Sequence, residues 1–415
     1  MPADQMLTLR ALSVTDLDQL SGLTEIVFNS EPVTDAERAI DAEVHELGRG
    51  RGVGVFDGDE MAGVGTVTSF ELTVPGGMLP MLGVLLIAVK PTYRRRGVMS
   101  RIIRHQLRTV HEQGGEPVAG LTASESVIYG RFGYGQAAYS ASFTVPRHRA
   151  KLRPVAGIDD VRIRMVPTAD SVAACEAVHA RQVGKRPGML VRPETWGRLY
   201  ATDLDPWRGG RSALRTVLAE RDGGTAGFAR YRTKEAWESG LHEGRTDVEE
   251  IYGDDAAAFA ALVRYLTDID LTTTTGFRRQ PVDSPLVYLL ADLRAAQVGI
   301  RESLYLRLVD VDRALAGRRY ADPVDLVLEL TDELCPWNAG RWRLTGDEKT
   351  AECTRTDAAA DLALDTRELA AVYLGGTTIA ALEQAALVTG LRSGAVAVAS
   401  RAFATQLAPW LQYGI

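Results

Sequence analysis

The sequence predicts an α+β fold in which mixed sheets are divided among several domains. A chain of 415 residues is too long for one ordinary core, and its length suggests two to four domains of roughly 100–200 residues each. Short apolar stretches joined by Asp-Gly turns alternate with amphipathic helical stretches, and one such series recurs in degenerate form later in the chain. We therefore expect three domains, at residues 1–150, 151–303 and 304–415.

The first 150 residues predict one mixed sheet with helices. The hairpin turn Asp57-Gly58-Asp59 is a strong signal for two paired strands. The expected elements are a strand at 7–9, helical segments up to residue 47, strands at 52–56, 63–72 and 82–89, a helix at 98–112, and strands at 117–121 and 138–145 that close the sheet. The helix is predicted by apolar residues at near-helical spacing, namely Val98, Ile102, Ile103, Leu107 and Val110.

The composition is typical of a soluble globular protein, with 46% apolar and 24% charged residues. The formal net charge of −7 argues against nucleic acid as a partner, because no basic stripe outside residues 94–96 is long enough to neutralise several phosphates. The same charge slightly favours cationic ligands. No run approaches the roughly 18 apolar residues of a membrane span, and the first residues lack a leader pattern, so we expect a cytoplasmic protein that binds no membrane.

The three cysteines are Cys175, Cys335 and Cys353. They predict neither a disulfide framework nor a zinc site, because their number is odd and no two of them have Cys-x-x-Cys spacing. The histidines are scattered without catalytic or metal-ligand spacing. The motifs Gly-x-Ser-x-Gly and Gly-x-x-x-x-Gly-Lys-Ser/Thr are absent from the sequence. We therefore expect no metal ion, and hydrolase and nucleotide-triphosphate functions lose support.

Residues 87–100 are the most informative stretch, because an apolar strand runs into an arginine-rich turn that opens directly into a helix. The first backbone N–H groups of a helix lack partners within the helix, and the helix dipole adds positive charge there, so an anion binds well. Gly97 allows close approach of the chain to a ligand, and Arg94–Arg96 can donate charge-assisted bonds to phosphate. The turn therefore predicts a pyrophosphate site, whereas a solvated surface turn is the alternative.

The spacing Arg94-x-x-Gly97-x-Met99 resembles the acetyl-CoA signature of the GNAT N-acetyltransferases, Arg/Gln-x-x-Gly-x-Gly/Ala, with Met99 as a departure. The later segment 124–135 contains Ile-Tyr-Gly-Arg-Phe-Gly-Tyr-Gly, which is similar to a segment of the Eis (enhanced intracellular survival) acetyltransferases. In that family an apolar residue after Arg-Arg-Arg-Gly is ordinary. The chain is thus identified as resembling the Eis family.

The resemblance implies where acetyl-CoA binds. The strand before the phosphate turn is splayed from its neighbour in GNAT domains, and its free backbone groups pair with the pantetheine amides. The residues expected to contact the cofactor are Ile87, Ala88, Val89, Arg94, Arg95, Arg96, Gly97, Val98, Met99 and Ser124. A central strand of the same composition would look identical, so the strand alone proves nothing.

The resemblance also implies the catalytic groups. Tyr129 matches the family tyrosine assigned as general acid to the CoA sulfur, although a buried tyrosine with a satisfied hydroxyl is the alternative. The base in this family is the terminal carboxylate, here of Ile415, and the apolar tail is consistent with burial or with plain packing. The family often ends in an aromatic residue instead. The acceptor pocket is expected along residues 28–40, with Phe28, Glu31 and Leu86 as candidate contacts.

The second domain repeats the first in degenerate form. Strands at 215–220 and 226–231 flank the turn Asp222-Gly223-Gly224, and a strand at 248–252 leads into a helix at 256–266. The turn before that helix is Gly253-Asp254-Asp255. Because carboxylates would repel pyrophosphate, we expect this copy to serve as a scaffold that cannot bind CoA.

The sequence of the last domain predicts strands and helices in an arrangement that differs from that of the first two domains. Strands are expected at 304–309, 326–330, 342–345 and 351–354, and helices at 366–373 and 379–385. The stretches 356–361 and 372–376 resemble the sterol-carrier-like α/β domain of Eis proteins. The whole chain is therefore expected to contain two tandem GNAT-like domains and a sterol-carrier-like domain.

The function implied by the resemblance is acetyl-CoA-dependent N-acetylation of amines on polycationic small molecules such as aminoglycosides. A protein lysine acetyltransferase differs only in its acceptor. A non-enzymatic lipid carrier acting through the last domain is a further alternative, and the intact turn at 94–97 argues against it. The resemblance suggests a homo-hexamer, a trimer of dimers, whereas the physiological acceptor cannot be inferred from one sequence.

Overall fold

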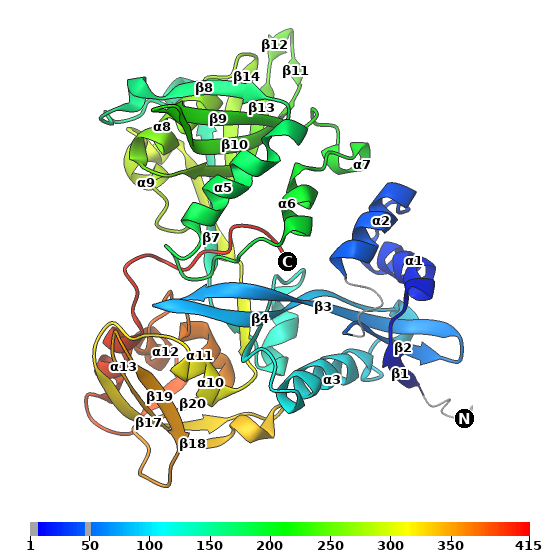
Figure 1. The fold of residues 1–415 in the computed structure, drawn as a ribbon, viewed down its shortest axis with the longest axis vertical. Helices are drawn as coiled ribbons and strands as arrows, with labels where there is room; N and C mark the ends of the chain where they lie inside the picture. The colour runs from blue at the N-terminus through cyan, green and yellow to red at the C-terminus, as the bar shows by residue number, and fades with distance from the viewer. Residues whose placement is uncertain (1–6, 46–50) are drawn as a thin grey trace. The chain divides into compact units, whose positions relative to one another are not determined.

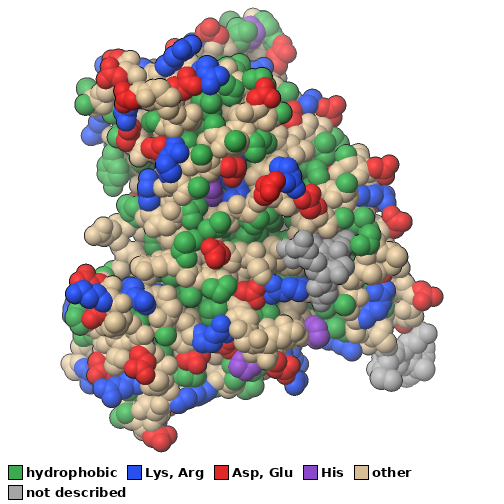
Figure 2. Space-filling model, viewed as in Figure 1, with side chains coloured by type: hydrophobic (Ala, Val, Ile, Leu, Met, Phe, Trp, Pro, Cys, Tyr) green, Lys and Arg blue, Asp and Glu red, His purple; other side chains and the backbone are tan. Residues whose placement is uncertain are grey.

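The computed structural model describes residues 7–45 and 51–415 and divides into two compact units. One unit holds Ser303–Gln406 and Gly414–Ile415 together with the described residues up to Ala138, and the other holds Tyr139–Glu302 with Leu407–Tyr413. Within the described ranges, no helix is long and apolar enough to cross a membrane. Figure 2 shows acidic and basic side chains interspersed over the face in view.

The first unit contains a seven-stranded sheet in the order β1-β2-β3-β4-β5-β16-β6; Figure 1 labels its strands β1 to β4. Its strands are β1 (Thr8–Ala11), β2 (Val53–Asp57), β3 (Glu60–Val74), β4 (Gly77–Val89), β5 (Val118–Leu121), β6 (Gly135–Gln136) and β16 (Tyr305–Leu308). The predicted hairpin between β2 and β3 is confirmed, and Gly58 supplies a φ of 61° at its turn.

Helices cover both faces of this sheet. They are α1 (Leu17–Phe28), α2 (Asp35–Val44), α3 (Val98–Glu112) and the short α4 (Ser126–Tyr129). The prediction of a helix at 98–112 is confirmed, and the apolar residues that predicted it are all buried. Ala88 packs with α1 residues such as Leu20, whereas Val98 and Ile102 of α3 pack on the opposite face. The last two residues of the helical stretch predicted up to residue 47 lie outside the described residues.

Strands β4 and β5 pair only over a short distance. Their parallel register covers Met81–Gly83 against Val118–Gly120, although β4 continues to Val89. On its other edge β4 stays paired with β3 up to Val89, with a register shift between Thr66 and Val67. In the part of the chain that the structure describes, the end of β4 therefore has no strand on its β5 side, as the resemblance implied.

The structure corrects the expected edge of this sheet. The strand predicted at 138–145 is β7 (Tyr139–Pro146), and it belongs to the sheet of the second unit. The strand predicted at 304–309 is β16, which pairs with β5 and β6 and takes the expected place of β7. The alternation of apolar residues identifies a strand but not its partner, because the partner depends on which sheet can bury the same face.

The second unit contains the other seven-stranded sheet, in the order β15-β7-β14-β13-β10-β9-β8. Its further strands are β8 (Arg162–Val166), β9 (Arg215–Arg221), β10 (Gly224–Lys234), β13 (Gly244–Gly253), β14 (Thr272–Gln280) and β15 (Gln297–Glu302), with a separate small hairpin of β11 (Trp237–Glu238) and β12 (Leu241–His242). Its helices are α5 (Val172–Gln182), α6 (Glu194–Ala201), α7 (Asp205–Arg208), α8 (Ala256–Thr267) and α9 (Leu286–Leu289). The predicted β9–β10 hairpin and the helix after β13 are confirmed.

The C-terminal part of the first unit adds a five-stranded sheet in the order β19-β18-β17-β20-β21. Its elements are α10 (Val311–Ala316), β17 (Val324–Thr331), β18 (Gly340–Gly346), β19 (Ala351–Arg355), β20 (Leu362–Asp365), α11 (Thr366–Val372), α12 (Ile379–Gln384), β21 (Val388–Gly390) and α13 (Ala395–Phe403). The buried Arg307 of β16 joins the two sheets, because it bonds both oxygens of Asp332 at 2.6 Å and the hydroxyl of Thr366 at 2.6 Å. The sequence did not predict α10, α13, β20 or β21.

Candidate active site

The N-terminus of α3 is built to receive an anion. Gly97 is its N-cap, with a φ of 78° and no side-chain cap. The first bond of the helix runs from Arg101 N–H to Gly97 C=O at 3.0 Å, so the N–H groups of Val98, Met99 and Ser100 have no carbonyl partner in the helix. No heavy atom lies within 4 Å of the position that a Cβ on Gly97 would occupy. The residues that carry these donors, together with Gly97, line a cavity.

The arginine turn adds positive charge to the same place. Arg95 has a φ of 61°, which turns the chain sharply before the helix. Arg96 lies over the ring of Tyr93 at 4.9 Å, and the Tyr93 hydroxyl bonds Asp57 and Glu60 at 3.0 Å each. Across residues 7–45 and 51–415, no carboxylate pairs with Arg94, Arg95 or Arg96. The turn is thus an uncompensated cationic site, and its residues fit the phosphates of a CoA.

A cavity of about 720 Å³ extends from this turn. The walls come from the end of α1, the free end of β4, the start of α3 and the segment that carries α4. The lining includes residues that were predicted to contact the cofactor, to contact the acceptor or to take part in catalysis. They are Phe28, Ile87, Val89, Arg94, Arg95, Gly97, Val98, Met99, Ser124 and Tyr129. Segments far apart in the sequence therefore meet where β4 leaves β5.

The other predicted residues lie elsewhere. Ala88 and Leu86 pack toward α1, on the face of β4 opposite to Ile87, because side chains alternate along a strand. The Arg96 side chain is exposed and stacks on Tyr93 instead of lining the cavity, and Glu31 is exposed in the α1–α2 connection. Ile415 is outside this lining as well.

Tyr129 presents its ring to the cavity from the end of α4. Burial, and then the charge of Glu125, raises the pKa of its phenol above the ordinary value. Its ring meets that of the buried Tyr134 edge to face at 5.9 Å. No partner for the Tyr129 hydroxyl is found within the described chain. The phenol is therefore protonated at neutral pH and available to a ligand.

Two glycines of the segment 124–135 are explained by packing. Gly133 has a φ of 77°, and a Cβ there would lie 2.5 Å from the Arg307 guanidinium. A Cβ on Gly135 would lie 2.1 Å from the carbonyl oxygen of Arg367 in α11. The segment thus holds Tyr129 while fitting against β16 and α11. Sequence reasoning missed the role of Arg307, since nothing local marks it as the neighbour of this loop.

The last residue of the chain lies close to the same loop. The Thr122 hydroxyl donates to the carboxyl-terminal oxygen of Ile415 at 2.5 Å, and the Ile415 residue is 9% exposed. Thr122 follows β5 directly and precedes the cavity residue Ser124 by two positions. Sequence reasoning did not identify Thr122, because a single threonine after a strand carries no signal.

Helix α2 and its C-cap carry two titratable groups, Asp41 and His45, that sequence reasoning did not single out and that lie outside the cavity lining. Burial, and then the charge of Glu37, raises the pKa of Asp41 to about 6. Burial lowers the pKa of His45 to about 4, and its Nδ1 lies 2.9 Å from the hydroxyl of Thr66. Thr66 is paired with Leu86 on β4. No group of three potential metal ligands occurs among the residues with described positions.

The corresponding helix start in the second unit carries carboxylates that are already engaged. Asp255 is the N-cap of α8, and its side chain accepts from Ala258 N–H at 2.9 Å and pairs with Arg221. Asp254 pairs with Arg181 at 2.7 Å and accepts from Gln182 at 2.8 Å. The carboxylates are therefore already bound at the helix start, and the expectation that this copy binds no CoA stays a prediction.

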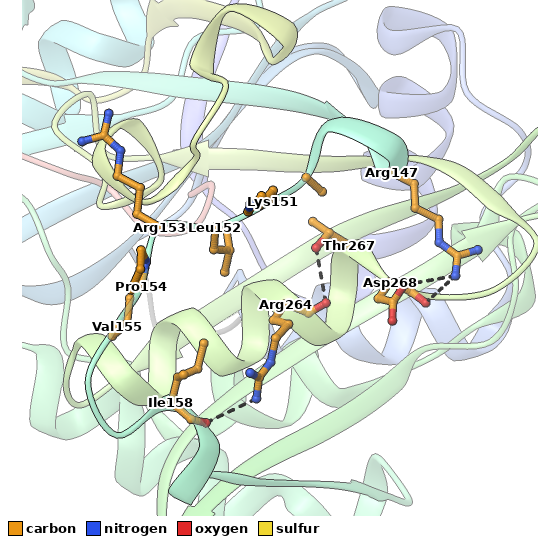
Figure 3. Close-up of a pocket in the computed structure, with 11 residues that line it drawn as sticks. Arg147, Lys151, Leu152, Arg153, Pro154, Val155, Ile158, Arg264, Thr267 and Asp268 are labelled. Atoms are coloured by element: carbon orange, nitrogen blue, oxygen red, sulfur yellow. Dashed lines mark hydrogen bonds and ion pairs between the residues drawn. The ribbon is translucent and has the colours of Figure 1, made fainter.

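A second cavity, of about 370 Å³, lies at the other end of α8 (Figure 3). Its basic residues are already engaged in part, since Arg147 pairs with Asp268 at 3.1 Å and Arg264 donates to the Ile158 carbonyl at 3.4 Å. The cavity is next to the C-terminal end of the helix, where the dipole disfavours an anion. It is therefore no counterpart of the site at α3.

Comparison with known families agrees with this architecture. Residues 8–137 match a family described as "Acetyltransferase (GNAT) domain", and residues 188–308 match a second family of the same description. Residues 311–412 match the family "Sterol carrier protein domain". The predicted fold class, two GNAT domains followed by a sterol-carrier-like domain, is confirmed.

Related proteins align with most or nearly all of the chain. An uncharacterized N-acetyltransferase of Streptomyces coelicolor is 45% identical over 98% of both chains. N-acetyltransferase Eis of Mycobacterium tuberculosis is 34% identical over 78% of both chains. The crystal structure of Eis1 from Mycobacterium abscessus has a TM-score of 0.83 and 32% identity, and covers 98% of this chain and 100% of its own. The chain is therefore an N-acetyltransferase that belongs to the Eis family of GNAT proteins.

Proposed function

We propose that the first GNAT domain transfers the acetyl group of acetyl-CoA to amines of polycationic small molecules such as aminoglycosides. The observation that carries the proposal is the uncompensated cationic turn at the N-terminus of α3, which opens onto a cavity containing Tyr129. Acetyl-CoA supplies an acetyl group activated as a thioester.

The cofactor would be held by two kinds of group. Arg94, Arg95 and the free N–H groups of α3 suit the phosphates, since charge-assisted bonds to phosphate are strong. The end of β4 at Ile87 and Val89 offers backbone groups that no neighbouring strand takes on the β5 side within the described chain. These groups fit the amides of an extended pantetheine arm.

Tyr129 is the proposed proton donor to the departing sulfur. A phenol has an ordinary pKa of about 10 and a thiol one of about 8.5, so proton transfer from phenol to thiolate is mildly uphill in water. Burial raises the pKa of Tyr129 further and keeps the proton on the hydroxyl at neutral pH. The site must therefore stabilise the tyrosinate as the proton leaves.

The terminal carboxylate of Ile415 is the proposed proton acceptor for the amine. Its bond to Thr122 supports this role, because that bond holds the carboxylate near the loop that carries Ser124 and Tyr129. A free α-carboxyl group has an ordinary pKa of about 3.3–3.7, so it is ionised at neutral pH and accepts a proton only weakly. Relay through a water molecule or burial during catalysis would raise its efficiency.

Acidic groups on the helix that follows the cavity wall in sequence support a cationic acceptor. Helix α1 ends at Phe28 in the cavity wall, and the following helix α2 carries four carboxylates, those of Asp35, Glu37, Asp41 and Glu43. Together with a net charge of −7, they favour binding of a polyamine over binding of an anion.

A turnover assay tests the proposal. Acetyl-CoA is combined with an aminoglycoside, a simple monoamine or a lysine peptide, and release of the CoA thiol is measured. We expect the aminoglycoside to give the highest kcat/KM. A preference for the lysine peptide would favour a protein acetyltransferase, and binding of fatty ligands without any thiol release would favour a lipid carrier.

The terminal base has a separate test. Two glycines added after Ile415 turn the carboxylate into a neutral peptide carbonyl, whereas the same addition at the N-terminus leaves it intact. We expect the C-terminally extended enzyme to bind acetyl-CoA normally and to acetylate amines at least about 100-fold more slowly. Equal turnover of the two extended enzymes would contradict the role of Ile415.

A further inference from the structure

The second GNAT domain has the same strand opening as the first. Strands β13 and β14 pair in parallel from Gly244 to Val248, and β13 then continues to Gly253 with no neighbouring strand on that side in the described chain. This is the arrangement of β4 and β5, where the cavity of the first domain lies. Because Asp254 and Asp255 exclude phosphate here, the opening is free for another occupant.

A segment of the same unit lies against both diverging strands. The indole N–H of Trp410 donates to the Arg279 carbonyl of β14 at 2.6 Å, and the Trp410 ring lies 5.8 Å from the ring of Tyr252 on β13. Arg279 has a φ of 51°, at a register irregularity of β14. Trp410 also belongs to a buried apolar cluster with Phe228 and Tyr252. We call residues 408–413 the tail segment.

Backbone and side-chain bonds hold the rest of the tail segment in register. Asp283 accepts from Ala408 N–H at 2.9 Å, Arg186 donates to Ala408 C=O at 2.7 Å, and Trp410 N–H donates to Pro187 C=O at 2.8 Å. Gly188, with a φ of 89°, lets the chain pass, since a Cβ there would lie 3.0 Å from the N and O atoms of Trp410.

Gln412 and Tyr413 complete the fit. The Gln412 amide bonds both backbone groups of Leu190, at 3.3 and 2.9 Å, and its NH₂ lies 3.0 Å from His179 Nε2. Since an amide nitrogen only donates, His179 accepts and is neutral. The Tyr413 ring lies 5.2 Å from that of Tyr200, and both Gln412 and Tyr413 are buried, with 4% and 1% exposure.

We propose that the second GNAT domain is a clamp for the chain's own C-terminus, with the tail segment bound at the strand opening that serves the cofactor in the first domain. Trp410, Gln412 and Gly188 are then positioning residues. Tyr413 is buried, and along the chain only Gly414 separates it from Ile415, so the clamp leaves a single residue between the bound tail segment and the terminal residue. This catalytic consequence rests on the proposed role of Ile415, but the clamp itself does not.

A matched pair of glycine substitutions tests the clamp. Gly188→Ala places a methyl group against the tail backbone, whereas Gly184→Ala imposes the same strain, at a φ of 90°, with no heavy atom within 4 Å of the new Cβ. Hydrogen exchange of the peptide covering residues 406–415 is followed together with kcat and the KM for acetyl-CoA. We expect Gly188→Ala to speed exchange at least about tenfold and to lower kcat with little change in that KM, whereas Gly184→Ala does neither.

The outcomes separate the two hypotheses. Equal exchange in the two variants would overturn the clamp. Faster exchange with unchanged kcat would keep the clamp and overturn the role of Ile415 in catalysis. If Gly188→Ala does not fold, Gln412→Leu serves instead, because it removes the bonds to Leu190 and His179 while keeping a side chain of similar size; tail exchange like that of the native chain would then overturn the clamp.

Discussion

The two GNAT domains differ most where a helix begins. At the start of α3 a glycine N-cap leaves the backbone donors free and three arginines stand nearby without carboxylate partners in the described chain. At the start of α8 an aspartate N-cap takes up a donor itself and pairs with Arg221. The same strand–turn–helix unit is thus open to an external anion in one copy and carries its own anion in the other. The comparison teaches that a few residues in the turn decide whether the backbone donors at the helix start stay open or are taken up by the protein's own carboxylates.

The largest expected effect concerns Tyr129 of the first domain. Tyr129→Phe removes the proposed proton donor, and we expect kcat to fall by roughly 10²–10⁴-fold, the range for loss of a positioned acid, with acetyl-CoA affinity kept. The matched control is Tyr288→Phe, because Tyr288 lies in the short helix α9 after β14 and is 68% exposed. Steady-state kinetics of both variants measure the change in kcat. A Tyr129→Phe enzyme as fast as the control would assign the proton transfer elsewhere.

The next effect tests the cationic turn. Arg94→Ala or Arg95→Ala removes a residue that lines the cavity, so each should weaken acetyl-CoA binding about 10- to 150-fold, from ~1.5–3 kcal/mol per charge-assisted bond. Arg96→Ala should weaken acetyl-CoA binding less than tenfold, since Arg96 stacks on Tyr93. Calorimetry gives both the affinity and the stoichiometry, which we expect to be one per chain. Two bound cofactors per chain would show that the second domain is not closed.

A smaller effect is a pH dependence that belongs to the second domain. Burial, and then the charge of Arg192, lowers the pKa of His179 to about 3. The folded state keeps this histidine neutral while the unfolded state protonates it below pH 6.5, so its stabilising contribution is complete above pH 6.5 and is lost progressively down to pH 3. At pH 5 the loss is about 2 kcal/mol relative to pH 7.

Urea unfolding at pH 7 and pH 5 measures that loss. His179→Gln keeps an acceptor for Gln412 but cannot titrate, so its stability should fall by about 2 kcal/mol less over this interval than that of the native protein. Other titrating groups cancel in this comparison. An identical fall in both proteins would mean that His179 is not buried as a neutral group.

The smallest effect concerns the cap of α8. Asp255→Ala removes a side chain that accepts from Ala258 N–H, and we expect a loss of about 1 kcal/mol in unfolding free energy. Acetyl-CoA stoichiometry and affinity should not change. Thermal unfolding and calorimetry on the same preparation measure both quantities. A second cofactor bound by this variant would show that Asp255 alone closes the second copy.

The site could be predicted from the sequence wherever a local pattern carried the chemistry. The turn at 94–97 and the start of α3 follow from caps, glycine and spacing, and the structure has them where expected. Residues on the free end of β4 were harder to assign. Ile87 and Val89 line the cavity whereas Ala88 and Leu86 face α1, because alternation puts neighbours on opposite faces and the sequence did not show which face was the site.

The sequence by itself determined the local elements: the Asp-Gly hairpins, the extent of α3, and the exchange of arginines for aspartates between the two copies. Those features depend on neighbours in the chain, through backbone conformation, helix periodicity and charge. Only the tertiary structure decided that β7 and β16 lie in different sheets from those expected, that Thr122 holds Ile415, and that Gln412 binds Leu190. These pairings join residues far apart in the chain, and their partners are chosen by which surfaces can be buried together rather than by any local pattern.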